Sequence, residues 1–185
     1  MTAQERLDLI NKEQLESSSI NELSYIIYEL TRLWNPKVVV EIGISEGCST
    51  LCILHGLSSE SFLYSYDIQE IRKNAIANVA VDDLVGKWIP NHLSSDAGFE
   101  LWDKDKAIDL LFIDGDHTNP QMYRDYYNWS QYVRVGGLIM FHDALLDTER
   151  LTKQRYVVSQ LCKEIGALVI PYSQGLGIYI KPTIK

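Results

Sequence analysis

Two short segments in the second half of the chain bring carboxylates and imidazoles together. One contains Asp114, Asp116 and His117, and the other ends in His142 and Asp143. Several negative charges gathered without a cation would lower stability, whereas a bound divalent ion would relieve the repulsion. These residues predict a metal site with Asp114 and Asp143 as ligands, and His142 and Asp116 as competitors for a third position. The alternative is a purely structural role, in which strand-end carboxylates accept hydrogen bonds from helix N-termini.

The ligand types also bear on which ion such a site would hold. Carboxylate-dominated sites with room for water favour Mg²⁺ or Mn²⁺. A histidine ligand shifts the preference toward Mn²⁺, Fe²⁺ or Zn²⁺. We expect Mg²⁺ or Mn²⁺.

A glycine-containing segment earlier in the chain, Gly43-Ile-Ser-Glu-Gly47, predicts a close approach of backbone to ligand. The glycines allow a tight turn, and the helix predicted from Cys48 presents unpaired N–H groups beside it. The dinucleotide fingerprint G-x-G-x-x-G needs glycine at two positions where this chain has Ser45 and Cys48, which weakens an NAD interpretation. A P-loop is excluded because no Gly-Lys-Ser/Thr follows. The segment favours a nucleotide-like pocket, although a turn that only reverses the chain has the same composition.

An acid at the end of the next predicted strand strengthens the nucleotide interpretation. Asp67 lies where a carboxylate can accept hydrogen bonds from both hydroxyls of a ribose. Further along, Ser94-Ser95-Asp96 could meet an adenine amino group, although a helix N-cap explains Asp96 equally well. Together with the glycine turn, these residues predict an adenosine-containing ligand.

The elements that must position these residues alternate between strand and helix. Apolar and β-branched runs predict strands at 38–42, 62–66, 87–92, 108–113, 138–141, 167–170 and 177–180. Helical spacing predicts helices at 20–34, 48–57, 71–81, 97–102, 120–133 and 149–165, the first opened by a capping box at Ser19–Glu22. The alternation implies an α/β fold with a parallel sheet between two layers of helices, in which ligands bind beyond the carboxyl ends of the strands. We therefore expect the polar side chains after the first, second, fourth and fifth strands to converge.

Length and composition set the class of protein. The chain has 185 residues, of which 46% are hydrophobic and 23% charged, as in a soluble globular protein with one continuous core. No linker or repeat divides it, so we expect one compact unit with an N-terminal helical segment at 1–35 and the main domain at 36–185. The formal charge of −8, without a basic patch, argues against nucleic acid or an anionic membrane as a partner.

Targeting signals and cysteines point to a cytoplasmic protein. No apolar run approaches the ~20 residues of a membrane span, and the polar N-terminus resembles neither a signal nor a transit peptide. The three cysteines lack a Cys-x-x-Cys pair and are expected to be reduced. Cys48 and Cys52 lie one helical turn apart and could join a metal site, but packing is the expected role.

Taken together, these motifs resemble class I S-adenosylmethionine-dependent methyltransferases over roughly Pro36 to Ile180. The resemblance rests on the segments 40–50, 66–67, 112–117 and 134–143, and is strongest to a group with I-D-G-D-H after the fourth strand and H-D after the fifth. That group is related in layout to metal-dependent O-methyltransferases that act on catechols and macrolide sugars. The resemblance implies a Rossmann-like three-layer α/β/α sandwich with a seven-stranded, mostly parallel sheet whose last strand is antiparallel.

The resemblance also implies roles for individual residues. The cofactor would contact residues in or just after the first four predicted strands. These residues are Glu41, Gly43, Ser45, Gly47, Asp67, Ile68, Ser95, Asp96 and Asp114. Within this set, Asp67 corresponds to the ribose ligand and Asp96 lies near adenine. Asp114 and Asp143 correspond to metal ligands, with His142 in the neighbouring ligand position. His117 falls where related metal-dependent enzymes carry their general base, so His117 and Asp114 are the expected catalytic residues. Two departures stand out, since Ser45 replaces a common glycine and His142 stands where relatives can have an acid.

The expected activity is methyl transfer to a hydroxyl of a small molecule, such as a sugar, a natural product or a phenol, with a divalent metal assisting. Two alternatives stay open. One is a glycosyltransferase that uses Asp114-Gly-Asp116 as an Asp-x-Asp motif, and the other is a cofactor-binding module without catalysis. The first helix must bury its apolar side, so it could cover the site or form a homodimer.

Overall fold

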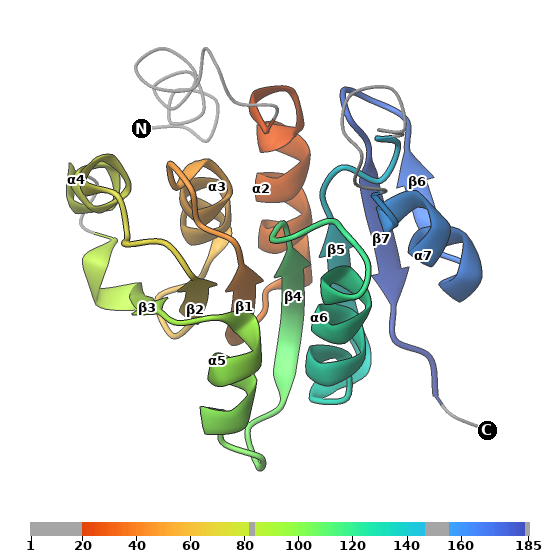
Figure 1. Ribbon diagram of the computed structural model, residues 1–185. Coiled ribbons are helices and arrows are strands. Elements are labelled where there is room, and N and C mark those ends of the chain that lie inside the picture. The colour runs from red at the N-terminus through yellow and green to blue at the C-terminus, as the bar shows by residue number, and fades with distance from the viewer. Residues whose placement is uncertain (1–19, 82–83, 147–155, 184–185) are drawn as a thin grey trace.

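The computed structural model describes residues 20–81, 84–146 and 156–183. Strands and helices alternate along this part of the chain (Figure 1). The strands are β1 (Val38–Ile42), β2 (Phe62–Asp67), β3 (Trp88–His92), β4 (Ile108–Ile113), β5 (Val133–Phe141), β6 (Leu168–Ile170) and β7 (Leu176–Ile180). The helices are α2 (Ser24–Trp34), α3 (Cys48–Gly56), α4 (Lys73–Val81), α5 (Ser95–Leu101), α6 (Gln121–Ser130) and α7 (Val158–Ile165), with short 3-10 turns at Asn21–Leu23 and Val85–Lys87.

The seven strands form one sheet in the order β3-β2-β1-β4-β5-β7-β6. Strands β1 to β5 pair in parallel, whereas β7 pairs antiparallel with both β5 and β6. In Figure 1 the arrow of β7 accordingly points against those of β4 and β5. This confirms the predicted seven-stranded, mostly parallel sheet with an antiparallel last strand.

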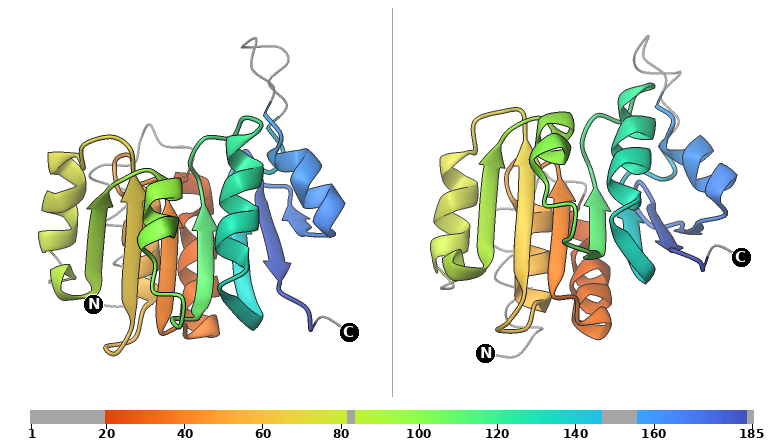
Figure 2. Two further views of the ribbon diagram at one scale, coloured as in Figure 1. Left: turned by 60° about the horizontal axis from the view of Figure 1, so that its bottom comes forward. Right: turned by 90° about the horizontal axis from the view of Figure 1, so that it is seen from below.

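Alternate residues of the strands pack against helices on opposite faces of the sheet (Figure 2). On one face, Val39, Leu110 and Met140 belong to the core that includes α2, α3 and α4. On the other face, Val40 and Leu111 belong to the core that includes α5, α6 and α7. Because both faces are covered, the central strands are apolar on both sides, and the predicted three-layer sandwich is confirmed.

Helix α2 lies directly against α3. A Cβ built on Gly56 at the end of α3 would come 2.8 Å from the Cβ of Thr31, so only glycine permits this approach. The proposed capping box depends on Ser19, which lies outside the described residues, so the N-terminal segment at 1–35 remains a prediction as a unit. Cys48, Cys52 and Cys162 form no disulfide and are buried in the core, consistent with the predicted packing role.

Several predicted element boundaries differ from the structure, and two of the differences have a clear cause in contacts with distant segments. The helix predicted at 149–165 begins only at Val158 in the described part of the chain, because Tyr156 forms a β-bridge with Thr118 and the Val157 N–H donates to the carbonyl of His117. The helix predicted at 120–133 ends at Ser130, and Val133 instead starts β5 by pairing with Ile108. In both places a contact with a distant segment overrides local helical periodicity.

None of the helices in the described ranges has the length and apolar character that a membrane crossing requires.

Candidate active site

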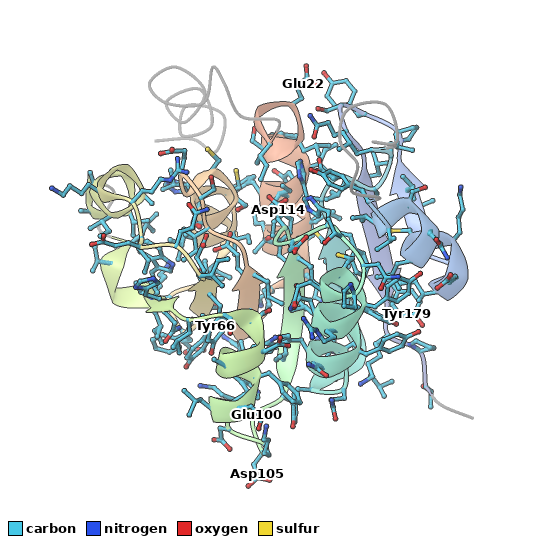
Figure 3. The ribbon with its side chains drawn as sticks, viewed as in Figure 1. Glu22, Tyr66, Glu100, Asp105, Asp114 and Tyr179 are labelled. Atoms are coloured by element: carbon cyan, nitrogen blue, oxygen red, sulfur yellow. The ribbon has the colours of Figure 1, made fainter. Side chains whose placement is uncertain are left out.

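A cavity of about 480 Å³ opens at the carboxyl end of the sheet, where β1 and β4 lie side by side. From β1 the chain winds outward through β2 and β3, and from β4 it winds the other way through β5, so this is the switch point where α/β folds bind ligands. In Figure 3, Asp114 lies beyond the end of β4, whereas Glu100 and Asp105 lie at the opposite end of the molecule. The cavity is lined by seven of the predicted cofactor residues: Gly43, Ser45, Asp67, Ile68, Ser95, Asp96 and Asp114.

The loop after β1 approaches the loop after β4 very closely. Gly43 has a φ of +91°, and a Cβ at this position would lie 2.2 Å from the carbonyl oxygen of Asp114. Gly47 has a φ of +81°, and a Cβ there would lie 2.9 Å from the Cβ of Ala75. Both glycines are therefore required by backbone conformation and by close packing. Only Gly43 faces the cavity, and Gly47 does not line it.

The Asp67 carboxylate ties the loop after β1 to the end of β2. Its Oδ2 accepts from the backbone N–H groups of Ile44 and Ser45 at 2.8 and 3.1 Å, and its Oδ1 accepts from the N–H of Gln69 at 2.8 Å. Asp67 and its neighbour Ile68, which is 70% exposed, both line the cavity. The carboxylate thus holds the loop in shape and lines the cavity, and its contact with a ribose stays a prediction.

Glu41 was predicted beside the cofactor, but it lies beneath the loop, fully buried and outside the cavity lining. Its carboxylate accepts from the hydroxyls of Ser49, Thr50 and Ser65 at 2.6 to 2.8 Å. Burial raises the pKa of Glu41 to about 7 against the opposing effect of these hydrogen bonds. Its position indicates that it anchors α3 and β2 to β1.

The far end of the cavity is formed by α5 and α6. The Ser94 hydroxyl accepts from the N–H of Ala97, so Ser94, rather than Asp96, provides the N-cap of α5. Gln121 and Asp125 of α6 also line the cavity. Asp125 was not predicted, although it is the one acid on the buried face of α6, between Met122 and Trp129. An acid within an apolar helix stripe is a usable signal, since burying a carboxylate is costly unless it has partners.

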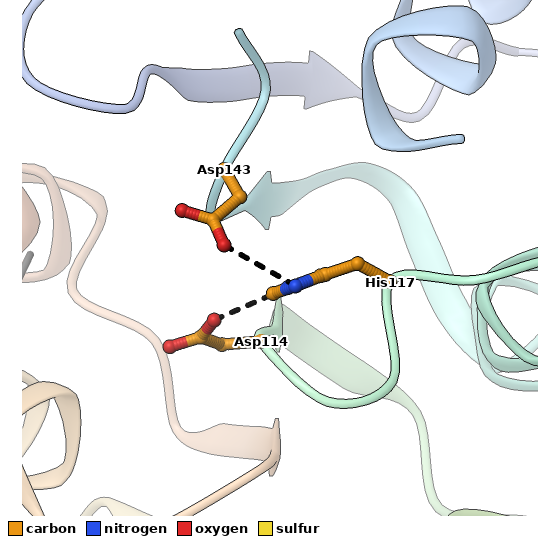
Figure 4. Close-up of side chains that lie close together, drawn as sticks. All are labelled: Asp114, His117 and Asp143. Atoms are coloured by element: carbon orange, nitrogen blue, oxygen red, sulfur yellow. Dashed lines mark ion pairs between the residues drawn. The ribbon is translucent and has the colours of Figure 1, made fainter. Parts of the chain in front are cut away.

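A cluster of carboxylates and imidazoles adjoins the cavity at Asp114 (Figure 4). The His117 ring lies between two carboxylates, with Nε2 3.3 Å from Asp114 Oδ1 and Nδ1 3.2 Å from Asp143 Oδ2. His142 Nδ1 lies 3.0 Å from Asp114 Oδ1 and 3.1 Å from Asp143 Oδ1. The predicted convergence of the residues after β4 and β5 is therefore observed. Asp116 does not belong to this group: it lines the cavity, and its Oδ1 accepts from the N–H and hydroxyl of Thr118.

The donor set of this cluster fits a divalent cation. One ligand atom each from Asp114, His117 and Asp143 lie within 4.8 Å of one another, and this is the only such group of three or more among the described residues. Asp143 Oδ1 is buried and, within the described residues, accepts no hydrogen bond of good geometry. Asp143 also has a φ of +59°, an uncommon conformation for a residue with a side chain that often marks functional sites. His142 was predicted as the third ligand, whereas this group contains His117 in its place.

The two carboxylates of the cluster differ in acidity. Burial acts to raise the pKa of Asp114, but hydrogen bonds and charge from His117 and His142 bring it below its ordinary value. Burial raises the pKa of Asp143, and the neighbouring imidazoles only partly offset this effect. Asp114 is therefore the more strongly ionised of the pair.

A family model described as a methyltransferase domain matches residues 40–144. This match spans more than half of the chain and includes every predicted site residue. The chain belongs to this methyltransferase-domain family.

Curated relatives agree with this assignment. Proteins named "Putative O-methyltransferase" from Mycobacterium sp. strain JLS and Mycobacterium avium strain 104 are each 30% identical, over 119 and 125 residues. Each match covers 63% of this chain and 53% or 52% of the relative, so the methyltransferase-domain chain spans about half the length of the curated relatives it matches.

Solved structures share the fold. The O-methyltransferase TomG from Streptomyces achromogenes, solved in complex with SAM, has a TM-score of 0.78 at 15% identity, covering 96% of this chain and 90% of TomG. The O-methyltransferase from Bacillus cereus, solved with SAH, has a TM-score of 0.73 at 17% identity, covering 96% of this chain and 89% of that one. At these identities the likeness establishes the architecture of the methyltransferase domain.

Proposed function

We propose that this protein is an S-adenosylmethionine-dependent O-methyltransferase that acts on a small hydroxylated molecule with the help of a divalent metal. The observation that carries the proposal is the junction at Asp114, which lines the switch-point cavity and also belongs to the cluster with His117 and Asp143. A cofactor in the cavity would therefore lie next to a group of proton acceptors and metal ligands. Membership of the methyltransferase-domain family supports the reaction class.

The cavity offers suitable partners for each part of the cofactor. Gly43 and Ser45 would face the methionine part, Asp67 the ribose hydroxyls, and Ile68 a face of the nucleoside. Ser95 and Asp96 would face the adenine edge. These assignments follow the chain order of the cavity wall from the loop after β1 to the start of α5.

Methyl transfer needs alignment and removal of one proton. The acceptor oxygen forms a bond to the methyl carbon while the carbon–sulfur bond breaks, which leaves a neutral thioether and a proton to be taken up by the protein. Well-oriented reactants gain about 7 to 11 kcal/mol over free encounter. An imidazole is suited to accept the proton near neutral pH. When bound, Mg²⁺ or Mn²⁺ would lower the pKa of the acceptor hydroxyl.

The two imidazoles can divide these roles in two ways. The three-residue group favours Asp114, His117 and Asp143 as the metal ligands. The distances from His142 Nδ1 to both carboxylates favour a second assignment, predicted from the sequence, in which His142 is the ligand and His117 accepts the proton. Titrating Mn²⁺ into His117→Ala and His142→Ala separates them: the variant that lost a ligand binds Mn²⁺ weakly, whereas the variant that lost the base binds Mn²⁺ normally and turns over slowly.

Binding measurements test the cofactor. Calorimetry with S-adenosylhomocysteine, NAD and a UDP-sugar should show tight binding of S-adenosylhomocysteine alone. At a concentration of about 100 times its Kd, S-adenosylhomocysteine should stabilise the fold by about 2.7 kcal/mol. A preference for the UDP-sugar would favour a glycosyltransferase instead. Adenosyl binding without methylation of any phenol or sugar in a broad panel, measured as thioether product, would favour a cofactor-binding module.

Replacing Asp143 with Ala tests the metal role. We expect the variant to lose metal-stimulated turnover and to keep its affinity for S-adenosylhomocysteine within about threefold, because Asp143 belongs to the metal group and does not line the cavity. Asp105→Ala, at the opposite end of the molecule, is the control. Full metal-stimulated activity in the Asp143 variant would refute the role.

A further inference from the structure

A hydrogen-bond network between α5 and α6 closes the end of the cavity that the adenine is proposed to occupy. Ser95 Oγ donates to Asp125 Oδ1 at 2.5 Å. Gln121 Nε2 donates to Asp125 Oδ1 at 2.7 Å and to Ser95 Oγ at 3.1 Å. All three residues line the cavity. Gln121 and Asp125 belong to α6 and lie 26 and 30 positions after Ser95 in the chain.

The direction of each hydrogen bond in this network is determined by its members. An ionised Asp125 can only accept. Burial raises the pKa of Asp125 to about 6, so the carboxylate is ionised under neutral and mildly alkaline conditions. The side-chain oxygen of Gln121 accepts from the Arg124 guanidinium, so the amide nitrogen faces Ser95 and Asp125.

The Ser95 hydroxyl is consequently left with acceptor capacity only. A serine hydroxyl has one hydrogen and two lone pairs. The hydrogen goes to Asp125 and one lone pair receives Gln121, so the second lone pair is available to a donor from the ligand. A ligand group that can only accept would meet a lone pair there.

We propose that Asp125 is a positioning residue that holds Ser95 as an acceptor and so selects a purine with an amino group at position 6 over one with an oxo group. This inference rests on the proposed adenosyl cofactor. An amino group at that position donates to the Ser95 lone pair, whereas a 6-oxo group places acceptor against acceptor. Sites built around a buried polar group discriminate strongly against a ligand that leaves it unpaired.

The test compares S-adenosylhomocysteine with S-inosylhomocysteine by calorimetry at about pH 8, where an acid of pKa about 6 is ionised. The wild-type protein should bind the adenosyl compound at least about tenfold more tightly. In Asp125→Asn the amide can donate to Ser95 and free its hydroxyl hydrogen for a 6-oxo group, so the ratio should fall to within about threefold. Asp105→Asn, remote from the cavity, should keep the wild-type ratio.

Ser95→Ala provides an independent route if Asp125→Asn folds poorly. Removing the hydroxyl removes the acceptor, so the ratio should fall again, and adding Asp125→Asn to Ser95→Ala should change the ratio little further. Equal loss of both affinities with an unchanged ratio would make Asp125 merely structural and overturn the inference. Equal affinities in the wild-type protein would overturn it too. Failure of the wild-type protein to bind either compound would instead refute the proposed function itself.

Discussion

Acidic residues at the carboxyl edge of the sheet have different partners, and the partners determine what each acid can do. Glu41 is held by three hydroxyls, Asp67 by backbone N–H groups, and Asp114 by imidazoles. Hydroxyls and backbone dipoles position a carboxylate without a full counter-charge, whereas an imidazole can also exchange protons with it. Glu41 therefore holds α3 and β2 against β1, Asp67 shapes the loop after β1, and Asp114 is the acid that we propose for the metal site.

Glu41 makes stability depend on pH. Its pKa is about 7 in the folded protein against an ordinary value of 4.5, so folding favours the protonated form. The stabilising contribution is complete below pH 4.5 and is lost as pH rises through about 7. Glu41→Gln lacks this titration, so its free energy of unfolding relative to wild type should rise between about pH 5 and 8 by on the order of 3 kcal/mol. Urea unfolding of both proteins across this range measures the difference, and parallel pH curves would contradict it.

At the scale of elements, two close contacts fix how α5 and α6 pack on the sheet. Helix α5 packs on the ring of Tyr66, a cavity residue at the end of β2, because a glycine at position 98 leaves room for the ring. Helix α6 is joined to the start of β5 by the ammonium of Lys181, which follows β7. Its Nζ donates to the carbonyl oxygens of Ser130, Gln131 and Val133 at 2.8, 3.2 and 2.7 Å.

Gly98→Ala should weaken both folding and cofactor binding. A Cβ at this position would lie 2.4 Å from the Tyr66 ring, so α5 or the ring must shift, at a cost of about 1 to 3 kcal/mol that exceeds the gain in helix propensity of about 1 kcal/mol. Urea unfolding and calorimetry with S-adenosylhomocysteine measure the two effects. Gly86→Ala is the matched control, since nothing lies within 4 Å of its Cβ. Equal behaviour of the two variants would refute the packing argument.

Lys181→Met should lower stability by about 1 kcal/mol, because the last carbonyls of α6 lose a charged donor. Because the Lys181 side chain is only partly buried, we expect the loss in free energy of unfolding to stay near the value for charges at helix ends. Lys73→Met, an exposed lysine at the start of α4, should change stability by less than about 0.5 kcal/mol. Thermal melts of both variants make the comparison, and similar shifts would argue against the capping role.

At the scale of the whole molecule, the cavity joins two halves of the sheet that are wound in opposite directions. Its wall takes residues from the loops after β1, β2 and β3 on one side and after β4 on the other. The strands β6 and β7 lie beyond β5 and contribute none of the lining. A ligand in the cavity therefore bridges segments that are distant in sequence and leaves the far edge of the sheet untouched.

This arrangement predicts the pattern of hydrogen exchange. Saturation with S-adenosylhomocysteine should slow amide exchange in all four loops, at 43–47, 67–72, 94–96 and 114–116, and leave 168–170 unchanged. Mass spectrometry of the free and saturated protein measures it. Protection confined to the loops of one half would show that the ligand does not span the switch point.

A second copy of the chain as partner and a cytoplasmic location remain predictions from the sequence. Analytical ultracentrifugation measures the first directly.

Local patterns in the sequence were sufficient for the order of strands and helices, for the cavity at the switch point and for seven of the residues that line it. The period of apolar residues reports an element directly, and the parallel arrangement brings the ends of its strands to one edge. The antiparallel last strand came from the resemblance to class I methyltransferases, which the family match supports.

Only the tertiary structure decided which side chains line the cavity. Glu41 and Gly47 stand in the predicted motif but do not line the cavity, whereas Asp125 lines it from α6, where the sequence predicted no site residue. Likewise His117, rather than His142, completes the group of three possible metal ligands. A motif gives the residue types near a site, whereas their orientation depends on the pleat of each strand and on contacts between segments far apart in the chain, such as Ser95 with Asp125.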